Sequence, residues 1–125
     1  MSQKHIFVVD DNTMFAEMLK DHLSKHPAYK VSVFHTGEDC LENLYLNPDL
    51  IILDYHLNDD FKEAANGIEI LEEIKKEKSP AHVIMMSSQT RYGVAAQTIS
   101  KGAEQYLIKD ENSFDNIDKL LEDIF

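Results

Sequence analysis

The segment that most constrains the fold of this chain is residues 49–54, DLIILD, in which four consecutive apolar residues lie between two acids. An apolar run of this kind, without alternation, is typical of a strand buried on both faces, as in a parallel sheet covered by helices. Its last residue, Asp54, is then expected at the carboxyl edge of the sheet, where open α/β sheets place their binding sites. The segment therefore predicts an α/β fold with Asp54 in a functional position.

Strand and helix patterns alternate along the whole chain. Residues 5–10, HIFVVD, form a second apolar run that ends in acid. Further strands are predicted at residues 29–35, 81–87 and 103–109, the first of these at an edge of the sheet. Helices are predicted between residues 12 and 27, 36 and 47, 67 and 78, 91 and 101, and 114 and 124. Five strands alternating with five helices predict a doubly wound parallel sheet in one domain, residues 1–125.

The charge of the chain argues against two classes of partner. It carries 12 Lys and Arg against 23 Asp and Glu, a formal charge of −11. This excess repels nucleic-acid phosphates and anionic lipid, so we expect no direct binding of nucleic acid or membrane. The N-terminus does not resemble a signal peptide and no apolar run approaches a membrane span, so we expect a cytoplasmic protein. The single Cys40 falls on an apolar helical face, which favours a buried structural thiol.

Polar residues at the ends of the predicted strands are expected to converge. Carboxyl ends of parallel strands meet at one edge of a sheet, which places Asp10, Asp11, Asp54, Ser87 and Lys109 around one crevice. Three neighbouring carboxylates repel one another, which calls for a cation, and oxygen ligands suit Mg²⁺. A carboxylate nucleophile, a metal ion, a Lys cation and a hydroxyl are together the groups that phosphoryl transfer to Asp54 requires. The constellation predicts a phosphate acceptor.

Four segments, VVDDN, LIILDYHL, IMMSS and YLIK, resemble the signature segments of the response-regulator receiver family of two-component signalling, and the resemblance spans the whole chain. It implies a flavodoxin-like sheet with strand order 2-1-3-4-5. It also implies phosphorylation of Asp54 by a histidine kinase or a histidine phosphotransfer protein. The metal, Mg²⁺ with Mn²⁺ as the alternative, is then expected on the side chains of Asp11 and Asp54 and the backbone carbonyl of His56, with Asp10 acting through water.

The resemblance also implies roles for residues near the acceptor. Ser87 and Lys109 are expected to contact the phosphoryl oxygens, and Tyr106 to be the aromatic whose rotamer follows the state of the site. His56 and Gln89 lie two residues beyond the acceptor and beyond Ser87, at positions that tune phosphoryl lifetime. Phosphorylation is expected to alter the surface of the fourth helix, fifth strand and fifth helix, which a downstream effector protein reads. On this interpretation the chain is no enzyme but a phosphoacceptor that assists its own phosphorylation and dephosphorylation, either as a stand-alone regulator or as an excised receiver.

Three positions depart from the family pattern. Asp110 stands where a Pro commonly follows the Lys, and Asn58 replaces another frequent Pro. The loop between residues 55 and 66 is longer than usual, and we hypothesise that residues 59–66 form an acidic flap that restricts partner access or adds outer-shell metal contacts.

Other functions remain open at this point. A pseudo-receiver would share the fold but ignore the phosphoryl group, and the departures above make this the main alternative. A metal-dependent phosphatase with an aspartyl intermediate would share the carboxylates, but VVDDN lacks the D-x-D pattern of that class. His22 and His26 stand four residues apart, a spacing compatible with a zinc site, although His residues near a helix C-terminus need no metal.

Overall fold

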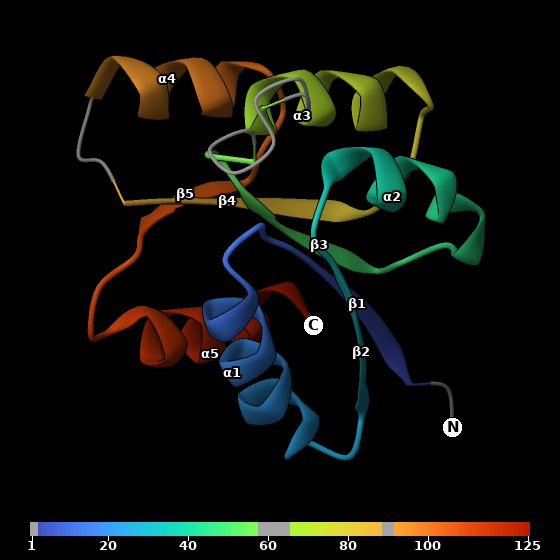
Figure 1. Ribbon diagram of the computed structural model, residues 1–125, viewed down its shortest axis with the longest axis vertical. Coiled ribbons are helices and arrows are strands. Elements are labelled where there is room, and N and C mark those ends of the chain that lie inside the picture. The colour runs from blue at the N-terminus through green and yellow to red at the C-terminus, as the bar shows by residue number, and fades with distance from the viewer. Residues whose placement is uncertain (1–2, 58–65, 89–91) are drawn as a thin grey trace.

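A parallel sheet of five strands runs through the centre of the molecule and carries helices on both faces (Figure 1). The computed structural model describes residues 3–57, 66–88 and 92–125. The strands lie in the order β2-β1-β3-β4-β5, which confirms the predicted order and the edge position of the second strand. Their bounds are β1 (Lys4–Val9), β2 (Tyr29–Phe34), β3 (Leu50–Asp54), β4 (His82–Ser87) and β5 (Gln105–Ile108).

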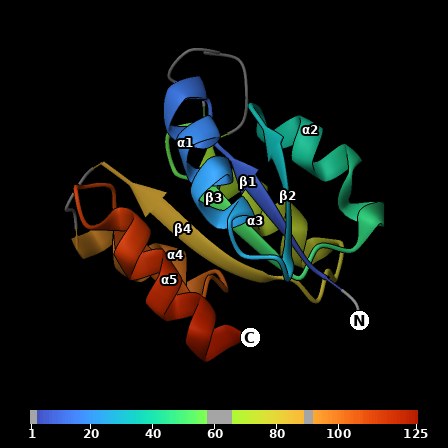
Figure 2. The same cartoon turned by 90° about the horizontal axis from the view of Figure 1, so that it is seen from below.

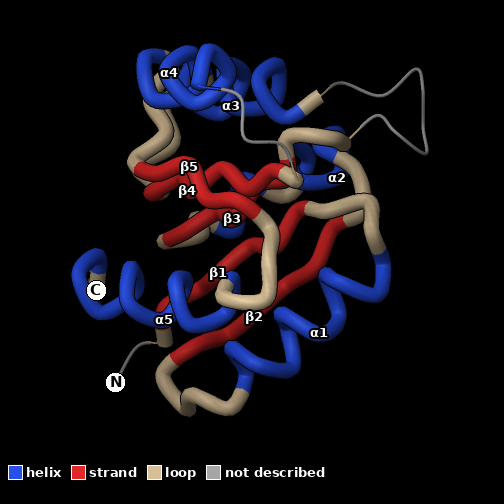
Figure 3. Tube along the Cα trace, turned by 90° about the vertical axis from the view of Figure 1, so that its left-hand side faces the viewer, coloured by secondary structure: helices blue, strands red, loops and turns tan. Residues whose placement is uncertain are grey.

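The helices fall into two layers. In Figures 1 and 2, α2, α3 and α4 cover one face of the sheet, and α1 and α5 cover the other. Figure 3 shows the same three layers from the side. The bounds are α1 (Thr13–Ser24), α2 (Gly37–Glu42), α3 (Gly67–Lys76), α4 (Tyr92–Ser100) and α5 (Ser113–Ile124), with a short 3-10 helix, η1 (Leu44–Leu46). No helix in the described part of the chain is long and apolar enough to cross a membrane.

Two hydrophobic clusters hold these layers together, because alternate residues of each strand face opposite sides of the sheet. All five residues of β3 are buried, as its unbroken apolar sequence predicts. Between the sheet and α3 the cluster includes Phe7, Ile51, Leu53, Val83, Met85, Ile70, Leu71 and Ile74. Between the sheet and helices α1 and α5 it includes Ile6, Val8, Ile52, Ile84, Leu19, Leu23, Ile117 and Leu121.

The second helix is shorter than predicted. The pattern predicts one helix from residue 36 to 47, but α2 ends at Glu42 and the 3-10 helix follows. The amide side chain of Asn43 donates to the carbonyl of Asp39 at 2.8 Å, the group that a continuing α-helix would bond to the backbone N–H of Asn43. That N–H bonds instead to the carbonyl of Cys40 at 3.0 Å, one residue closer, so the α-helix tightens and ends.

Local contacts show how two helices are capped and where the single cysteine lies. The hydroxyl of Thr36 accepts from the backbone N–H of Asp39 at 3.2 Å and caps α2. Cys40 is fully buried, and burial raises the pKa of its thiol to about 12, as expected for a structural cysteine. Gly102, at φ 111°, lies in the left-handed region just after α4, a conformation that commonly ends a helix and that glycine adopts without strain.

The close approach of α3 to the end of β3 gives a first prediction. A Cβ at Gly67 would lie 2.5 Å from the carbonyl oxygen of Asp54 and 2.7 Å from the Cα of Tyr55, both of them backbone atoms that cannot rotate away. We expect Gly67→Ala to lower the free energy of unfolding by about 1–3 kcal/mol, measured by chemical denaturation. Glu73→Ala, on the exposed face of the same helix, is the control and should change stability by no more than about 0.5 kcal/mol. Equal stabilities for the two variants would contradict this account of the contact.

Candidate functional site

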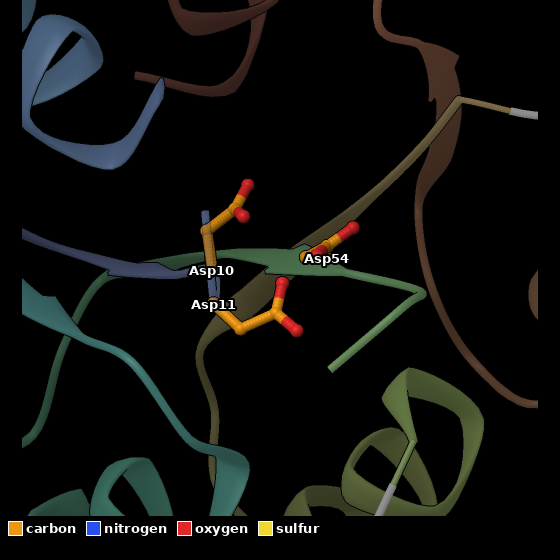
Figure 4. Close-up of side chains that lie close together, drawn as sticks. All are labelled: Asp10, Asp11 and Asp54. Atoms are coloured by element: carbon orange, nitrogen blue, oxygen red, sulfur yellow. The ribbon is translucent and has the colours of Figure 1, made fainter. Parts of the chain in front are cut away.

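Three carboxylates meet at the carboxyl edge of the sheet. Asp10 and Asp11 follow β1 directly, and Asp54 ends β3, the strand paired with β1. One oxygen from each of the three lies within 4.8 Å of the other two. Figure 4 shows the three side chains grouped at the ends of these strands. Asp10 and Asp54 are each 3% exposed, and Asp11 is half-buried. The three acids that the sequence places at one edge of the sheet therefore do lie together there.

Lys109 supplies the positive charge of this cluster. It follows β5, and its backbone N–H donates to the carbonyl of Ser87 at 2.8 Å, which fixes the end of β5 against the end of β4. Its ammonium Nζ lies 2.6 Å from Oδ2 of Asp10 and 3.4 Å from Oδ1 of Asp54. The side chain is 16% exposed, so these ion pairs are shielded from solvent. The described residues contain no cis peptide bond, so the peptide between Lys109 and Asp110 is trans.

Ser87 and His56 lie beside the acidic cluster. Ser87 ends β4 and is completely buried. Its hydroxyl oxygen is 3.4 Å from Nε2 of His56. The backbone N–H of His56 donates to Oδ1 of Asp54 at 3.2 Å, which orients the carboxylate. Two of the residues predicted to surround the acceptor are therefore in place around it.

Other predicted residues lie further away or outside the described residues. Tyr106 is half-buried on β5, opposite Met85 of β4, and packs against the cluster beneath α3. Gln89, Asn58 and all of the 59–66 flap except Asn66 lie outside the described residues. Asn66 itself caps α3 in a reciprocal capping box with Glu69.

His22 and His26, whose spacing is compatible with a zinc site, each bond to another group in the structure. Nε2 of His22 bonds to the carboxylate of Asp118 at 2.8 Å, and Nδ1 of His26 accepts from the backbone N–H of Ala28 at 3.2 Å. Among the described residues, the acidic cluster of Asp10, Asp11 and Asp54 is the only group of three or more His, Cys, Asp or Glu with metal-ligand spacing.

Burial and neighbouring charge change the acidity of Asp54. Burial of the carboxylate, reinforced by the negative charge of Asp10, raises the pKa of Asp54 to about 7, against the opposing effect of Lys109. A carboxylate in this environment gains from a second positive charge nearby.

The residues present fit a hard divalent cation. Three carboxylate oxygens lie close together, oxygen being the ligand type that Mg²⁺ prefers, and one Lys neutralises only one of the three negative charges. A dication makes up the remaining difference.

Sequence reasoning missed three residues that shape the site. The backbone N–H of Asn12 donates to Oδ1 of Asp10 at 2.9 Å, while its side chain caps α1. The position of Asn12 just before a helical pattern is the signal that identifies such a cap. The ring of Phe15 lies beneath the ammonium of Lys109, and Ser113 bonds to the backbone on both sides of Lys109. No sequence pattern reveals these last two contacts, because they depend on where α1 and α5 pack.

Comparisons of the sequence and of the structure with known proteins agree on one family. The model described as "Response regulator receiver domain" matches residues 6–122. The protein-glutamate methylesterase/protein-glutamine glutaminase of Thermotoga maritima is 35% identical over 112 residues, which cover 86% of this chain and 31% of that protein. Chemotaxis protein CheY of the same organism is 29% identical over 108 residues, covering 85% of each. The crystal structure of the response regulator domain of T. maritima CheB has a TM-score of 0.79 at 32% identity, covering 98% of this chain and 93% of that one.

These matches establish the class of protein that the fold and the acidic pocket define. The chain belongs to the response regulator receiver domain family of two-component signalling. It spans about a third of the length of the methylesterase, but most of the length of the chemotaxis protein.

The raised pKa of Asp54 predicts how stability depends on pH. Between about pH 4, near its ordinary pKa, and about pH 7, the folded carboxyl keeps a proton that the unfolded chain releases, so stability falls as pH rises through this window. Without divalent ions, we expect Asp54→Asn to raise the free energy of unfolding at pH 8 by about 1–3 kcal/mol, with the gain vanishing near pH 4. The expected gain is smaller than the full shift in the pKa of Asp54 implies, because the Asp54→Asn variant also loses the ion pair between Lys109 and Asp54.

Thermal denaturation across this pH range, with and without Mg²⁺, measures the effect. Asp21→Asn, an exposed carboxylate on α1, is the control and should show no such pH-dependent gain. Added Mg²⁺ should stabilise the wild type more than Asp54→Asn. An advantage for Asp54→Asn that is the same at pH 4 and pH 8 would show that the charge of the buried carboxylate is not its cause.

Proposed function

We propose that Asp54 accepts a phosphoryl group and that this modification switches a protein-binding surface of the domain. The observation that carries the proposal is the convergence of Asp10, Asp11 and Asp54 with Lys109 at the ends of three strands. Membership of the receiver family supports it. The placement of Lys109 against Asp54, although Asp110 follows it, favours a phosphorylatable receiver over a pseudo-receiver.

In the proposed reaction, an oxygen of Asp54 attacks the phosphorus of a phosphohistidine on the donor. The new P–O bond forms as the P–N bond breaks, and the departing imidazole nitrogen takes up a proton. Lys109 is placed to pair with a phosphoryl oxygen, because its ammonium already lies 3.4 Å from Asp54. Ser87 offers a hydroxyl from the neighbouring strand. The backbone N–H of His56 keeps the Asp54 carboxylate oriented during the approach.

The metal is proposed to be Mg²⁺, with Mn²⁺ as the alternative. The side chains of Asp11 and Asp54 and the backbone carbonyl of His56 would hold it, and Asp10 would reach it through water. When bound, the ion supplies Lewis acidity and neutralises charge on the phosphoryl group. Asp10 has a second role on this proposal, because its carboxylate holds Lys109 in place before the donor arrives.

The proposed donor is a histidine kinase or a histidine phosphotransfer protein, and the output is read by a downstream effector protein. The strongly acidic character of the chain favours protein partners over nucleic acid or anionic membrane. The chain then acts as a phosphoacceptor that assists its own phosphorylation and dephosphorylation, and not as an enzyme with a separate substrate. We propose that this exchange takes place in the cytoplasm, as the N-terminal sequence leads us to expect.

The proposed switch joins Asp54 to the surface of α4, β5 and α5. The phosphoryl group carries about −1.5 to −2 charge in place of the single negative charge of the Asp54 carboxylate, and it attracts the groups at the ends of β4 and β5, Ser87 and Lys109. Tyr106 lies on β5, three residues before Lys109, and is half-buried. A shift of its ring between buried and exposed positions would change the surface that a partner meets.

Intact mass spectrometry tests the proposed function. With a small phosphodonor and Mg²⁺, we expect the wild type to gain the mass of one phosphoryl group, which hydroxylamine should remove because an acyl phosphate is labile. Asp54→Asn should gain none, and Asp11→Asn should lose at least about 90% of the rate, since one metal ligand is gone. Asp21→Asn, remote and exposed, should behave as the wild type. A wild type that stays unmodified would reject the proposal.

A further test concerns the lifetime of the phosphoryl group. The His56 ring stands 3.4 Å from the Ser87 hydroxyl. We propose that it limits the approach of water, so we expect His56→Ala to hydrolyse the acyl phosphate about fivefold faster, equivalent to a ~1 kcal/mol lower barrier. The side chain of Gln89 is proposed to act likewise, and Gln89→Ala should also change the decay rate. His82→Ala, at the opposite end of β4, is the control. Decay rates that match the wild type in both variants would refute the tuning role of these residues.

A further inference from the structure

The side chain of Lys109 needs more restraint than its backbone provides. A Lys side chain has several rotatable bonds and many rotamers, whereas productive phosphoryl transfer needs its ammonium in one place. In the structure Nζ lies between carboxylates from two different strands, 2.6 Å from Asp10 and 3.4 Å from Asp54. Some neighbouring group must favour this rotamer over the others.

The backbone around Lys109 is held by Ser113 at the start of α5. The hydroxyl of Ser113 accepts from the backbone N–H of Asp110 at 2.8 Å and donates to the carbonyl of Ile108 at 3.3 Å. Ser113 is 2% exposed, so both bonds are protected from water. These bonds fix where the Lys109 side chain starts, but not where its ammonium ends.

The ring of Phe15 fixes the other end of the side chain. The ammonium of Lys109 lies 4.5 Å from the centroid of this ring, which comes from α1 and is half-buried. A cation over the face of an aromatic ring is attracted by the ring's negative face, and more strongly where water is excluded. The attraction acts on the ammonium itself, the group that must be near Asp54.

The Phe15 ring is itself supported from α5. Its centroid is 6.0 Å from that of Phe114, at an interplanar angle of 57°. The Phe114 ring stacks on His22 of α1 at 4.9 Å and 30°, and His22 bonds to Asp118 of α5. Both helices cover the same face of the sheet (Figures 1 and 3). These contacts across α1 and α5 hold the Phe15 ring in one position under Lys109.

We propose that Phe15 is a positioning residue for phosphoryl transfer, whose ring face holds the Lys109 ammonium beside Asp10 and Asp54 before the donor arrives. This inference rests on the proposed function of Asp54. A purely structural role for Phe15 would require only an apolar side chain of similar size. The proposed role requires in addition a ring with a negative face, and this difference can be measured.

A series of fluorinated phenylalanines at position 15 separates the two roles. Replacing Phe15 by 4-fluoro-, 3,5-difluoro- and 3,4,5-trifluorophenylalanine weakens the negative face stepwise while the ring stays nearly the same size. We expect the rate of phosphorylation by a small phosphodonor with Mg²⁺ to fall in that order, by about three- to tenfold for the trifluoro ring. Phe15→Leu should fall to a similar or lower rate.

The control series places the same three residues at position 125. The ring of Phe125 also lies under a Lys, with Nζ of Lys4 5.4 Å from its centroid. Lys4, however, is the first residue of β1, whereas Asp10 follows the last residue of that strand. Its fluorination should leave the phosphorylation rate within about twofold of the wild type, because this cation–π contact does not touch the site. Repeating the position-15 series in Lys109→Met, with unfolding of the unphosphorylated protein as the readout, should abolish any graded effect on stability.

Each outcome decides the inference. A graded fall at position 15 and a flat series at position 125 support it, as does a graded effect on stability that Lys109→Met removes. A flat series at position 15 in a protein that is otherwise phosphorylated overturns the role of Phe15 and leaves the proposed function intact. A wild type that gains no phosphoryl group rejects the proposed function, and the positioning role with it.

Discussion

The structure depends on one electrostatic conflict, the placement of three carboxylates at the buried edge of a parallel sheet. Burial and the charge of Asp10 raise the pKa of Asp54 to about 7, so this arrangement opposes the folding of the metal-free protein at neutral pH. Lys109 relieves only part of the repulsion through its two ion pairs. The same conflict makes the site suited to a divalent cation, because the three carboxylates carry more negative charge than Lys109 alone can neutralise.

The remainder of the fold supplies the stability that this site removes. The strand that carries Asp54 is buried at all five residues, and β1 and β4 pair with it on either side. Hydrophobic clusters on both faces anchor this central part of the sheet. The proposed reaction needs a rigid strand end, because a carboxylate that meets a phosphorus atom in line tolerates little displacement. Packing of the core and reactivity at the edge are therefore linked through the same strand.

Lys109 shows how several weak contacts together place one charged group. The family pattern commonly has Pro after this Lys, and in this chain Asp110 takes that position. Ser113 holds the backbone on both sides of Lys109, and the ring of Phe15 faces the ammonium. Both residues come from helices on the same face of the sheet, so the packing of α1 and α5 bears directly on the geometry at Asp54.

The sequence by itself determined the α/β class, the approximate bounds of the strands and the convergence of the acids, because periodicity and the geometry of parallel sheets are local or general properties. It failed at residues 43–47, where the Asn43 side chain competes for a backbone carbonyl and ends the helix early. Only the tertiary structure decided which groups surround Lys109. The contact with Phe15 joins residues 94 positions apart, and its distance depends on helix packing that no periodic pattern encodes.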